Sequence, residues 1–347
     1  MPGPKRTRVL IVDDSAIVRK LLAEALAGEP DLEVVGTAPD PYVARDKILS
    51  LDPDVLTLDI EMPRMDGLTF LRKLMHFHPM PAVIISSLAQ PSARAAVDAM
   101  EAGAVEVLAK PGGPYSIGEL RQTLAAKIRA AAAARLRRPA AAEAAPSAAA
   151  APAAPADTVI AIGASTGGTE AIGRVLREVP AGAPGIVIAQ HIPPGFSRAF
   201  ANRLNETCAI AVKEAEDGDS VRPGHALVAP GDFHLVLRGG RGGFVVNVKT
   251  GPRVCYQRPS VDVLFQSVAD SAGAHAVGVL LTGMGADGAQ GMLRMRQAGA
   301  HTIAQDEATC VVFGMPREAI RRDAACRVLP LSRIAHAMLS PPRAARP

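Results

Sequence analysis

Residues 158–168 read TVIAIGASTGG, and this stretch decides the fold of the second half of the chain. Thr158–Ile162 is an apolar run of strand length, and Gly163-Ala164-Ser165-Thr166-Gly167 follows it directly. A Gly-x-Ser-x-Gly turn between a strand and a helix presents its serine at the sheet edge, beside unpaired N–H groups of the helix. By itself the turn fits a serine that merely caps the helix equally well. The stretch therefore predicts an α/β domain and makes Ser165 a candidate nucleophile.

Two later strand ends supply the partners that a nucleophilic serine requires. The predicted strand Gly185–Ala189 ends in Gln190-His191, and the predicted strand Ala276–Thr282 leads into a turn that contains Asp287. Because the carboxyl ends of parallel strands meet at one sheet edge, both side chains are expected beside Ser165. A serine needs a base, and the base needs an acid that orients it. The sequence thus predicts a triad of Ser165, His191 and Asp287, in an order unlike that of common α/β-hydrolases.

The turn before Asp287 also supports a different interpretation. Gly283-Met284-Gly285-Ala286-Asp287-Gly288 has the Gly-x-Gly-x-x-Gly spacing of dinucleotide-binding turns, with Asp306 and Glu307 roughly 20 residues further on. This alternative makes the domain a nicotinamide-dependent oxidoreductase. However, such a turn normally opens a nucleotide-binding domain, and the alternative leaves Ser165 and His191 without a role. A third class, a binding module with an inactive esterase site, is disfavoured by the complete triad pattern.

The remaining histidines and the cysteines are interpreted as structural residues. His225 and His234 flank a predicted strand and are expected to be surface or cap histidines. The four cysteines form no Cys-x-x-Cys pair and have no histidine at zinc-site spacing. We expect them to be small buried residues in a reducing compartment. They are Cys208, Cys255, Cys310 and Cys326.

Strands and helices also alternate in the first 130 residues. The predicted strands are Arg8–Val12, Leu32–Gly36, Val55–Leu58, Ala82–Ser86 and Val105–Leu108, and the predicted helices begin near Ser15, Asp40, Gly67, Ser92 and Ser116. Five such units predict a doubly wound α/β domain with helices on both faces of a parallel sheet. An Ala- and Pro-rich linker at 131–156 separates this domain, 1–130, from a second α/β domain at 157–347. Within the second domain, Ala226–Lys249 carries glycine turns and is expected to form antiparallel strands.

Charge and hydropathy exclude several classes of function. The formal net charge is +4, and much of the excess lies in Arg129–Arg138, which we interpret as a solvated helix end. No basic stripe with interleaved aromatic residues indicates nucleic-acid binding. No apolar run reaches membrane-spanning length, and the basic Met1–Arg8 is followed only by a short strand. We therefore expect a cytoplasmic protein without membrane insertion.

Polar residues gather at four strand ends of the first domain. Asp13 and Asp14 end the first predicted strand, Asp59 ends the third, Ser86 ends the fourth, and Lys110 follows the fifth. Clustered carboxylates repel one another unless a cation joins them, and their oxygens suit Mg²⁺. A carboxylate beside such an ion is a candidate acceptor for a phosphoryl group. Any one of these residues alone fits a helix cap, but the whole set predicts a phosphorylation site.

These residues resemble the signatures of two-component response-regulator receivers. The resemblance covers about residues 7–130 and rests on Val12–Ser15, Leu58–Gly67, Ser86-Ser87 and Ala109–Pro111. It implies that Asp59 accepts the phosphoryl group and that Mg²⁺ is held by Asp14, Asp59 and the main-chain carbonyl of Glu61. It also implies that Ser86 supplies a hydroxyl that follows the phosphoryl group.

A second resemblance covers about residues 157–335. Ile162–Glu170, Gln190–Pro193, Arg258–Asp262, Leu281–Ala289 and Val312–Pro316 resemble the chemotaxis protein-glutamate methylesterase and protein-glutamine glutaminase family (CheB). The resemblance implies oxyanion donors near Thr166 and Met284. It implies a methylated glutamate on the cytoplasmic helices of a chemoreceptor as substrate, glutamine deamidation as a second activity, and no cofactor at the esterase site. It further implies a chemotaxis histidine kinase as phosphodonor and an active site inhibited by the unphosphorylated receiver.

Overall fold

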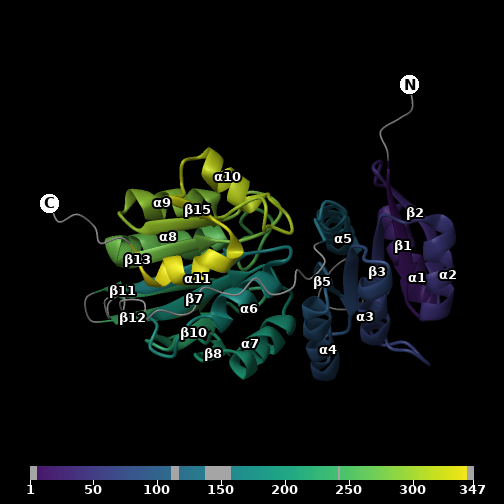
Figure 1. The fold of residues 1–347 in the computed structure, drawn as a ribbon, viewed down its shortest axis with the longest axis horizontal. Coiled ribbons are helices and arrows are strands. Elements are labelled where there is room, and N and C mark those ends of the chain that lie inside the picture. Colours follow the sequence, from purple (N-terminus) through teal and green to yellow (C-terminus); the bar gives the residue numbers. More distant parts are fainter. Residues whose placement is uncertain (1–5, 111–116, 137–157, 241–242, 342–347) are drawn as a thin grey trace. The chain divides into compact units, whose positions relative to one another are not determined.

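The computed structural model describes residues 6–110, 117–136, 158–240 and 243–341. The chain divides into two compact units, residues 1–138 and 139–347, each with its own parallel sheet (Figure 1). The predicted linker lies outside the described residues from residue 137 onward, as do Ser116 and Gly242. Within the described residues, no helix combines the length and the apolar character needed to cross a membrane.

The first unit is a five-stranded parallel sheet in the order β2-β1-β3-β4-β5. Helix α1 packs against α5, and α3 packs against α4, so helices cover both faces of the sheet. Ser15, Asp40 and Asp66 accept amide hydrogen bonds at the N-termini of α1, α2 and α3. The elements are β1 (Thr7–Val12), α1 (Ala16–Leu26), β2 (Leu32–Ala38), α2 (Pro41–Leu51), β3 (Val55–Asp59), α3 (Gly67–Phe77), β4 (Ala82–Ser86), α4 (Gln90–Glu101), β5 (Glu106–Ala109) and α5 (Ile117–Ala132). The predicted doubly wound fold is confirmed.

The second unit is built on a seven-stranded parallel sheet in the order β15-β14-β13-β6-β7-β10-β8. The unit also contains a three-stranded antiparallel sheet in the order β11-β12-β9. The strands are β6 (Val159–Ala164), β7 (Gly185–Gln190), β8 (Ala211–Glu214), β9 (Ser220–Val221), β10 (His225–Val228), β11 (His234–Gly240), β12 (Gly243–Lys249), β13 (Ala276–Leu280), β14 (His301–Gln305) and β15 (Arg327–Leu329). Strand β6 lies at the point where the order reverses, which is where open sheets bind ligands.

Helices also cover both faces of this sheet. Helix α6 packs against α7 and α11, whereas α9 packs against α8 and α10. The helices are α6 (Gly168–Arg177), α7 (Phe196–Thr207), α8 (Val261–Ala272), α9 (Ala289–Gln297), α10 (Met315–Arg321) and α11 (Leu331–Leu339), with a 3-10 turn η1 at Gly273–His275. Buried aliphatic residues of β6, β7 and β13 meet α8 in the core, around Phe265 and Leu264. The chain has no Trp, and the largest fully buried side chains are two Phe and several Leu and Ile. Val, Met and Ala complete the core.

Two expectations from the sequence need correction at the level of the fold. Ala226 to Val228 belongs to β10, which pairs in parallel with β7 and β8, so only β11 and β12 form the expected antiparallel hairpin. A short apolar run does not reveal its partner strand, and this run lies before the glycine turns. Cys255 and Cys326 are exposed, and only Cys310 is buried.

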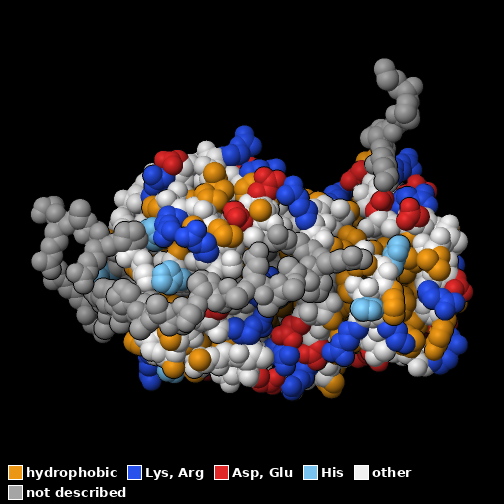
Figure 2. Space-filling view, in the orientation of Figure 1, with side chains coloured by type: hydrophobic (Ala, Val, Ile, Leu, Met, Phe, Trp, Pro, Cys, Tyr) orange, Lys and Arg blue, Asp and Glu red, His pale blue; other side chains and the backbone are white. Residues whose placement is uncertain are grey.

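The visible face in Figure 2 shows Lys and Arg side chains interspersed with Asp and Glu.

Candidate functional site

The carboxylate cluster of the first unit forms where β1, β3 and β5 end. Asp13 and Asp59 are almost fully buried, and a carboxylate oxygen of each lies within 4.8 Å of one from the exposed Asp14. Lys110 follows β5, and its Nζ donates to Asp59 Oδ2 at 2.6 Å and lies 3.7 Å from Asp13 Oδ2. The parallel register of β1 with β3 brings these strand ends together, as predicted.

Burial dominates the electrostatics of this cluster. It raises the pKa of Asp59 to about 6, even though Lys110 lowers it, and it also raises the pKa of Asp13. Burial alone would lower the pKa of Lys110, but the hydrogen bond to Asp59 and the negative charges of the three aspartates together outweigh this effect and raise it. Asp13 Oδ2 accepts no hydrogen bond within the described residues. Burial destabilises the ionised form of these carboxyls, and one of their oxygens accepts no hydrogen bond from the described residues. Such a cluster suits a hard divalent cation such as Mg²⁺.

Two other predicted residues of this cluster take different positions. Ser86 is buried at the end of β4, and its hydroxyl donates to Ser92 O at 3.4 Å instead of pointing to a partner in the cluster. The side chain of Glu61 accepts hydrogen bonds from Ser92 Oγ and Ser87 Oγ. Its carboxylate is thus engaged with the segment after β4, which leaves its main-chain carbonyl for the role that the receiver resemblance implies.

In the second unit, Ser165 and His191 follow neighbouring strands. Ala164 of β6 pairs with Gln190 of β7, so the next residue of each strand lies at the same sheet edge, about 5 Å from the other. His191 N donates to Ala164 O at 3.2 Å, and Gln190 Nε2 donates to Ser165 O at 2.9 Å. Both Ser165 and His191 are 5% exposed. The strand order therefore places the candidate nucleophile and base side by side.

Strand β13 brings the third predicted residue to the same edge. Ser165 N donates to Thr282 O at 3.0 Å, which joins the turn after β6 to the segment after β13. A Cβ on Gly283 would lie 2.7 Å from Ser165 Cβ, so only glycine fits there. Asp287 lies further along this segment, and its Oδ2 is 2.7 Å from His191 Nε2.

Asp287 is a densely hydrogen-bonded carboxylate. Besides His191, its donors are Ser260 Oγ at 2.8 Å and the amides of Val261, Asp262 and Gly288 at 2.7, 3.0 and 3.1 Å. Burial pushes the pKa of Asp287 upward, but His191 and these amides outweigh it and hold the pKa below its usual value. An ionised Asp287 accepts the proton of His191 Nε2, which leaves Nδ1 as the unprotonated ring nitrogen. His191 Nδ1 has no hydrogen-bond partner within the described residues.

The predicted oxyanion donors lie beside the serine. Thr166 is buried in the turn between β6 and α6, where Gly167 adopts a φ of 73°. Met284 follows Gly283, which contacts Ser165, and the side chain of Met284 is 43% exposed. The amide of Met284 makes no hydrogen bond within the described part of the chain. It is therefore available to a ligand at this edge.

Two residues that support Asp287, Ser260 directly and His234 through Ser260, had no role in the prediction from the sequence. Ser260 caps α8 and donates to Asp287, although it stands in a motif that the resemblance included. His234 is buried, so the surface alternative of the expected surface or cap histidine is wrong. Its Nδ1 accepts from Ser260 N at 3.2 Å and its Nε2 lies 2.9 Å from Pro252 O. A serine before an apolar helical run was the available signal for Ser260, whereas nothing local marked His234.

The dinucleotide alternative loses its structural basis. In a dinucleotide site, the glycine-rich turn leaves the amides at the helix N-terminus to the pyrophosphate. Here the amide of Gly288 donates to Asp287 Oδ1, and that of Gly291 donates to Asp262 Oδ1 at 2.6 Å. The glycines instead allow close packing, because a Cβ on Gly288 would lie 2.6 Å from Val261 Cγ1. The N-terminus of α9 is thus occupied by carboxylates of the protein itself.

A receiver fold with a buried carboxylate cluster precedes, in the same chain, an α/β domain that brings a serine, a histidine and an aspartate to one sheet edge. This arrangement is typical of a response regulator with an enzymatic output domain. Residues 9–124 match the response regulator receiver domain, and residues 160–338 match the family described as CheB methylesterase. The chain belongs to the CheB methylesterase family.

Relatives of similar length support this assignment. The chain is 55% identical to protein-glutamate methylesterase/protein-glutamine glutaminase 2 of Syntrophus aciditrophicus, with 95% of this chain and 97% of the relative covered. It is 52% identical to the protein-glutamate methylesterase/protein-glutamine glutaminase of Escherichia coli, over 96% and 97% of the two chains. The crystal structure of the Thermotoga maritima CheB methylesterase catalytic domain matches with a TM-score of 0.51 and 39% identity, over 52% of this chain and 97% of that one.

Proposed function

We propose that this chain is a phosphorylation-controlled protein-glutamate methylesterase that also deamidates protein glutamines. The observation that carries the esterase chemistry is the 2.7 Å contact between His191 Nε2 and Asp287. His191 Nδ1 has no hydrogen-bond partner among the described residues, and Ser165 follows the neighbouring strand. The curated relatives that span nearly the whole chain bear the names of both activities. The substrate is a methylated glutamate on the cytoplasmic helices of a chemoreceptor, and the protein acts in the cytoplasm.

The reaction follows from the positions of the three side chains. Ser165 Oγ attacks the side-chain carbonyl of the methylated glutamate while His191 Nδ1 takes the hydroxyl proton. Asp287 stabilises the imidazolium that forms. The oxyanion is bound by the amides of Thr166 and Met284. His191 gives the proton to the leaving oxygen, which departs as methanol, or to the leaving nitrogen of a glutamine, which departs as ammonia. Water then hydrolyses the acyl-enzyme to glutamate and frees Ser165.

The receiver supplies the control. Asp59 accepts a phosphoryl group from a chemotaxis histidine kinase, with Lys110 beside it at 2.6 Å. Asp14, Asp59 and the main-chain carbonyl of Glu61 would hold Mg²⁺, and Asp13 adds a buried carboxylate with an unused oxygen. When bound, this ion supplies positive charge that neutralises the phosphoryl oxygens during transfer. The unphosphorylated receiver inhibits the esterase, and phosphorylation relieves the inhibition.

The test is methanol release from receptor membranes that carry methylated glutamates. Wild-type protein releases methanol, and Ser165→Ala lowers the rate by about 10³-fold or more, because the nucleophile is lost. Ser271→Ala is the matched control, since Ser271 on α8 only donates to Leu237 O at 3.1 Å. A small phosphodonor raises the wild-type rate and leaves Asp59→Asn unchanged. Normal release by Ser165→Ala would contradict the esterase assignment, and equal stimulation of Asp59→Asn would contradict the control.

A further inference from the structure

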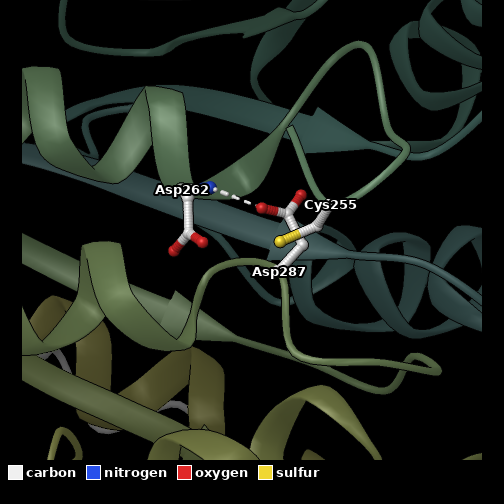
Figure 3. A group of neighbouring side chains, drawn as sticks. All are labelled: Cys255, Asp262 and Asp287. Atoms are coloured by element: carbon white, nitrogen blue, oxygen red, sulfur yellow. Dashed lines mark hydrogen bonds between the residues drawn. The ribbon is translucent and has the colours of Figure 1, made fainter. Parts of the chain in front are cut away.

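A second carboxylate lies directly behind Asp287. Asp262 occupies the first turn of α8, and its own amide donates to Asp287 Oδ1 at 3.0 Å (Figure 3). Figure 3 also shows the carboxylate of Asp262 pointing away from that contact. There its Oδ1 accepts the amide of Gly291 in the first turn of α9 at 2.6 Å. Asp287 thus caps α8, the helix that carries Asp262, and Asp262 caps α9, which begins two residues after Asp287.

Glycine makes this reciprocal capping possible. A Cβ on Gly291 would lie 2.7 Å from Phe265 Cβ and 3.1 Å from Asp262 Cα. A Cβ on Gly288, where φ is 87°, would also meet α8. The two helix N-termini therefore approach closely, and both present amides to carboxylates, which the positive end of each helix dipole favours. The segment that carries Asp287 is held from both sides.

The cluster does not have the character of a metal site. Cys255 Sγ and a carboxylate oxygen each of Asp262 and Asp287 lie within 4.8 Å of one another. However, the oxygens of Asp287 already accept five hydrogen bonds, so a metal ion would have to displace them. The pKa of the Cys255 thiol is raised, first by burial and then by the two carboxylates, which disfavours the thiolate that a metal requires.

We propose that Asp262 is a positioning residue of the esterase site. It clamps the segment that carries Asp287 and, when ionised, places a second negative charge behind the Asp287–His191 pair. This inference rests on the proposed esterase function and extends it to a residue that does not touch the substrate. The added charge stabilises the imidazolium of His191, which forms as Ser165 is deprotonated.

The surroundings make Asp262 titrate near neutral pH. Burial, with a smaller contribution from the charge of Asp287, raises its pKa to about 6 although the Gly291 amide lowers it. The titratable groups that face it are Asp287 on the segment before α9 and Cys255 on the loop before α8, with Arg322 acting on Cys255. Asp262 is therefore mostly ionised above about pH 6 and neutral below it. The negative charge of Asp262 therefore favours the charged form of His191 only above about pH 6.

The test is the pH dependence of methanol release by the full-length Asp262→Asn variant. Asparagine retains an oxygen for the Gly291 amide and removes only the charge. We expect kcat at pH 8 to fall about tenfold with an unchanged KM. We also expect the acidic limb of kcat/KM to move about half a pH unit lower, because a negative charge behind the Asp287–His191 pair is removed. Asp262→Ala also removes the clamp, so its kcat should fall further.

Asp270→Asn is the matched control. Asp270 lies on the same helix, is exposed and bonds only to Gln266 Nε2, at 2.8 Å. A folded fraction that is constant with pH leaves the midpoint of the profile unchanged. Circular dichroism of Asp262→Asn over the same pH range therefore shows whether unfolding contributes to the shift. A profile of Asp262→Asn that coincides with those of wild type and Asp270→Asn would overturn the inference. If wild type itself releases no methanol, the proposed function fails, and this inference falls with it.

Discussion

Asp59 and Asp287 are both buried aspartates near the carboxyl ends of parallel strands, yet their surroundings differ. Asp59 accepts only from Lys110 and from the amide of Glu61, and its neighbour Asp13 has an oxygen without a hydrogen-bond partner in the described structure. Asp287 accepts from five donors. The pKa of Asp59 is raised to about 6, whereas that of Asp287 is lowered. Burial raises the pKa of both carboxyls. For Asp287 the hydrogen bond and charge of His191, together with the amide donors, outweigh burial, whereas Lys110 does not outweigh it for Asp59, and the charge of Asp13 adds to the rise.

The difference matches what each carboxylate has to do. A carboxylate that attacks phosphorus beside a metal ion must keep lone pairs available, and the fold leaves it destabilised. A carboxylate that orients a histidine must stay ionised and fixed, and hydrogen bonds to all its lone pairs achieve both. Asp59 belongs to a strand, whereas Asp287 lies between the N-termini of α8 and α9. Helix N-termini are the source of the additional donors.

The largest expected effect comes from Asp287→Asn. An amide has one acceptor oxygen, so its NH₂ group would face either His191 and the Val261 amide or Ser260 and two further amides. We expect kcat for methanol release to fall by about 10³-fold or more, because His191 loses its ionised partner. Thermal unfolding of the same sample shows whether the protein is folded. A kcat within tenfold of wild type in folded protein would show that the five donors do not serve catalysis.

Asp59→Asn is expected to stabilise the receiver, whereas Asp287→Asn impairs the site that it belongs to. Because the pKa of Asp59 is raised, the folded receiver binds its proton more tightly than the unfolded chain does. Wild-type stability from this group is therefore present below about pH 4 and is lost as the pH rises through about 6. Removing the charge should stabilise the receiver by about 2 kcal/mol at pH 8 and by almost nothing at pH 4. Hydrogen exchange of the β3 and β4 amides in the full-length protein measures this free energy.

Magnesium provides the control for that prediction. The ion should stabilise the wild-type receiver at pH 8 and have a much smaller effect on Asp59→Asn, because the variant lacks one carboxylate of the cluster. Destabilisation by Asp59→Asn at pH 8 without magnesium would mean that the Lys110 contact outweighs burial. The comparison with Asp287 would then fail.

Ser260→Ala removes one of the five donors without changing Asp287 itself. Ser260 also caps α8, because its Oγ accepts from Val263 N at 3.3 Å. We expect kcat to fall about tenfold and the free energy of unfolding to fall by about 1 kcal/mol. Ser271→Ala, on the same helix but away from Asp287, should leave kcat unchanged. An equal loss of kcat in both variants would assign the effect to helix stability instead of to Asp287.

The sequence predicted the two strand-end clusters because each depends on strand order and local turns. Asp59 and Ser165 both end or follow short apolar runs, and their surroundings in the sequence mark them. The donors to Asp287 could not be derived this way, because Ser260, Val261 and Asp262 precede it by more than 20 residues and meet it only through the packing of α8 on α9. His234 and the parallel pairing of β10 depend on the same kind of long-range contact. The chemical roles of Ser165, His191 and Asp59 remain predictions.

The smallest effect on folding is expected from Asp14→Asn. Asp14 is exposed, and only its carboxylate joins the cluster, so the metal-free receiver should keep its stability within about 0.5 kcal/mol. Stabilisation by magnesium should nevertheless be largely lost, because an exposed carboxylate can ligate the ion without being part of the core. The measurement is the hydrogen-exchange free energy of β3 amides with and without magnesium. Asp46→Asn, an exposed aspartate on α2 that pairs only with Arg45, is the control and should retain the full magnesium effect. Retention of that effect in Asp14→Asn would remove Asp14 from the proposed ligands and leave the two buried carboxylates as the cation site.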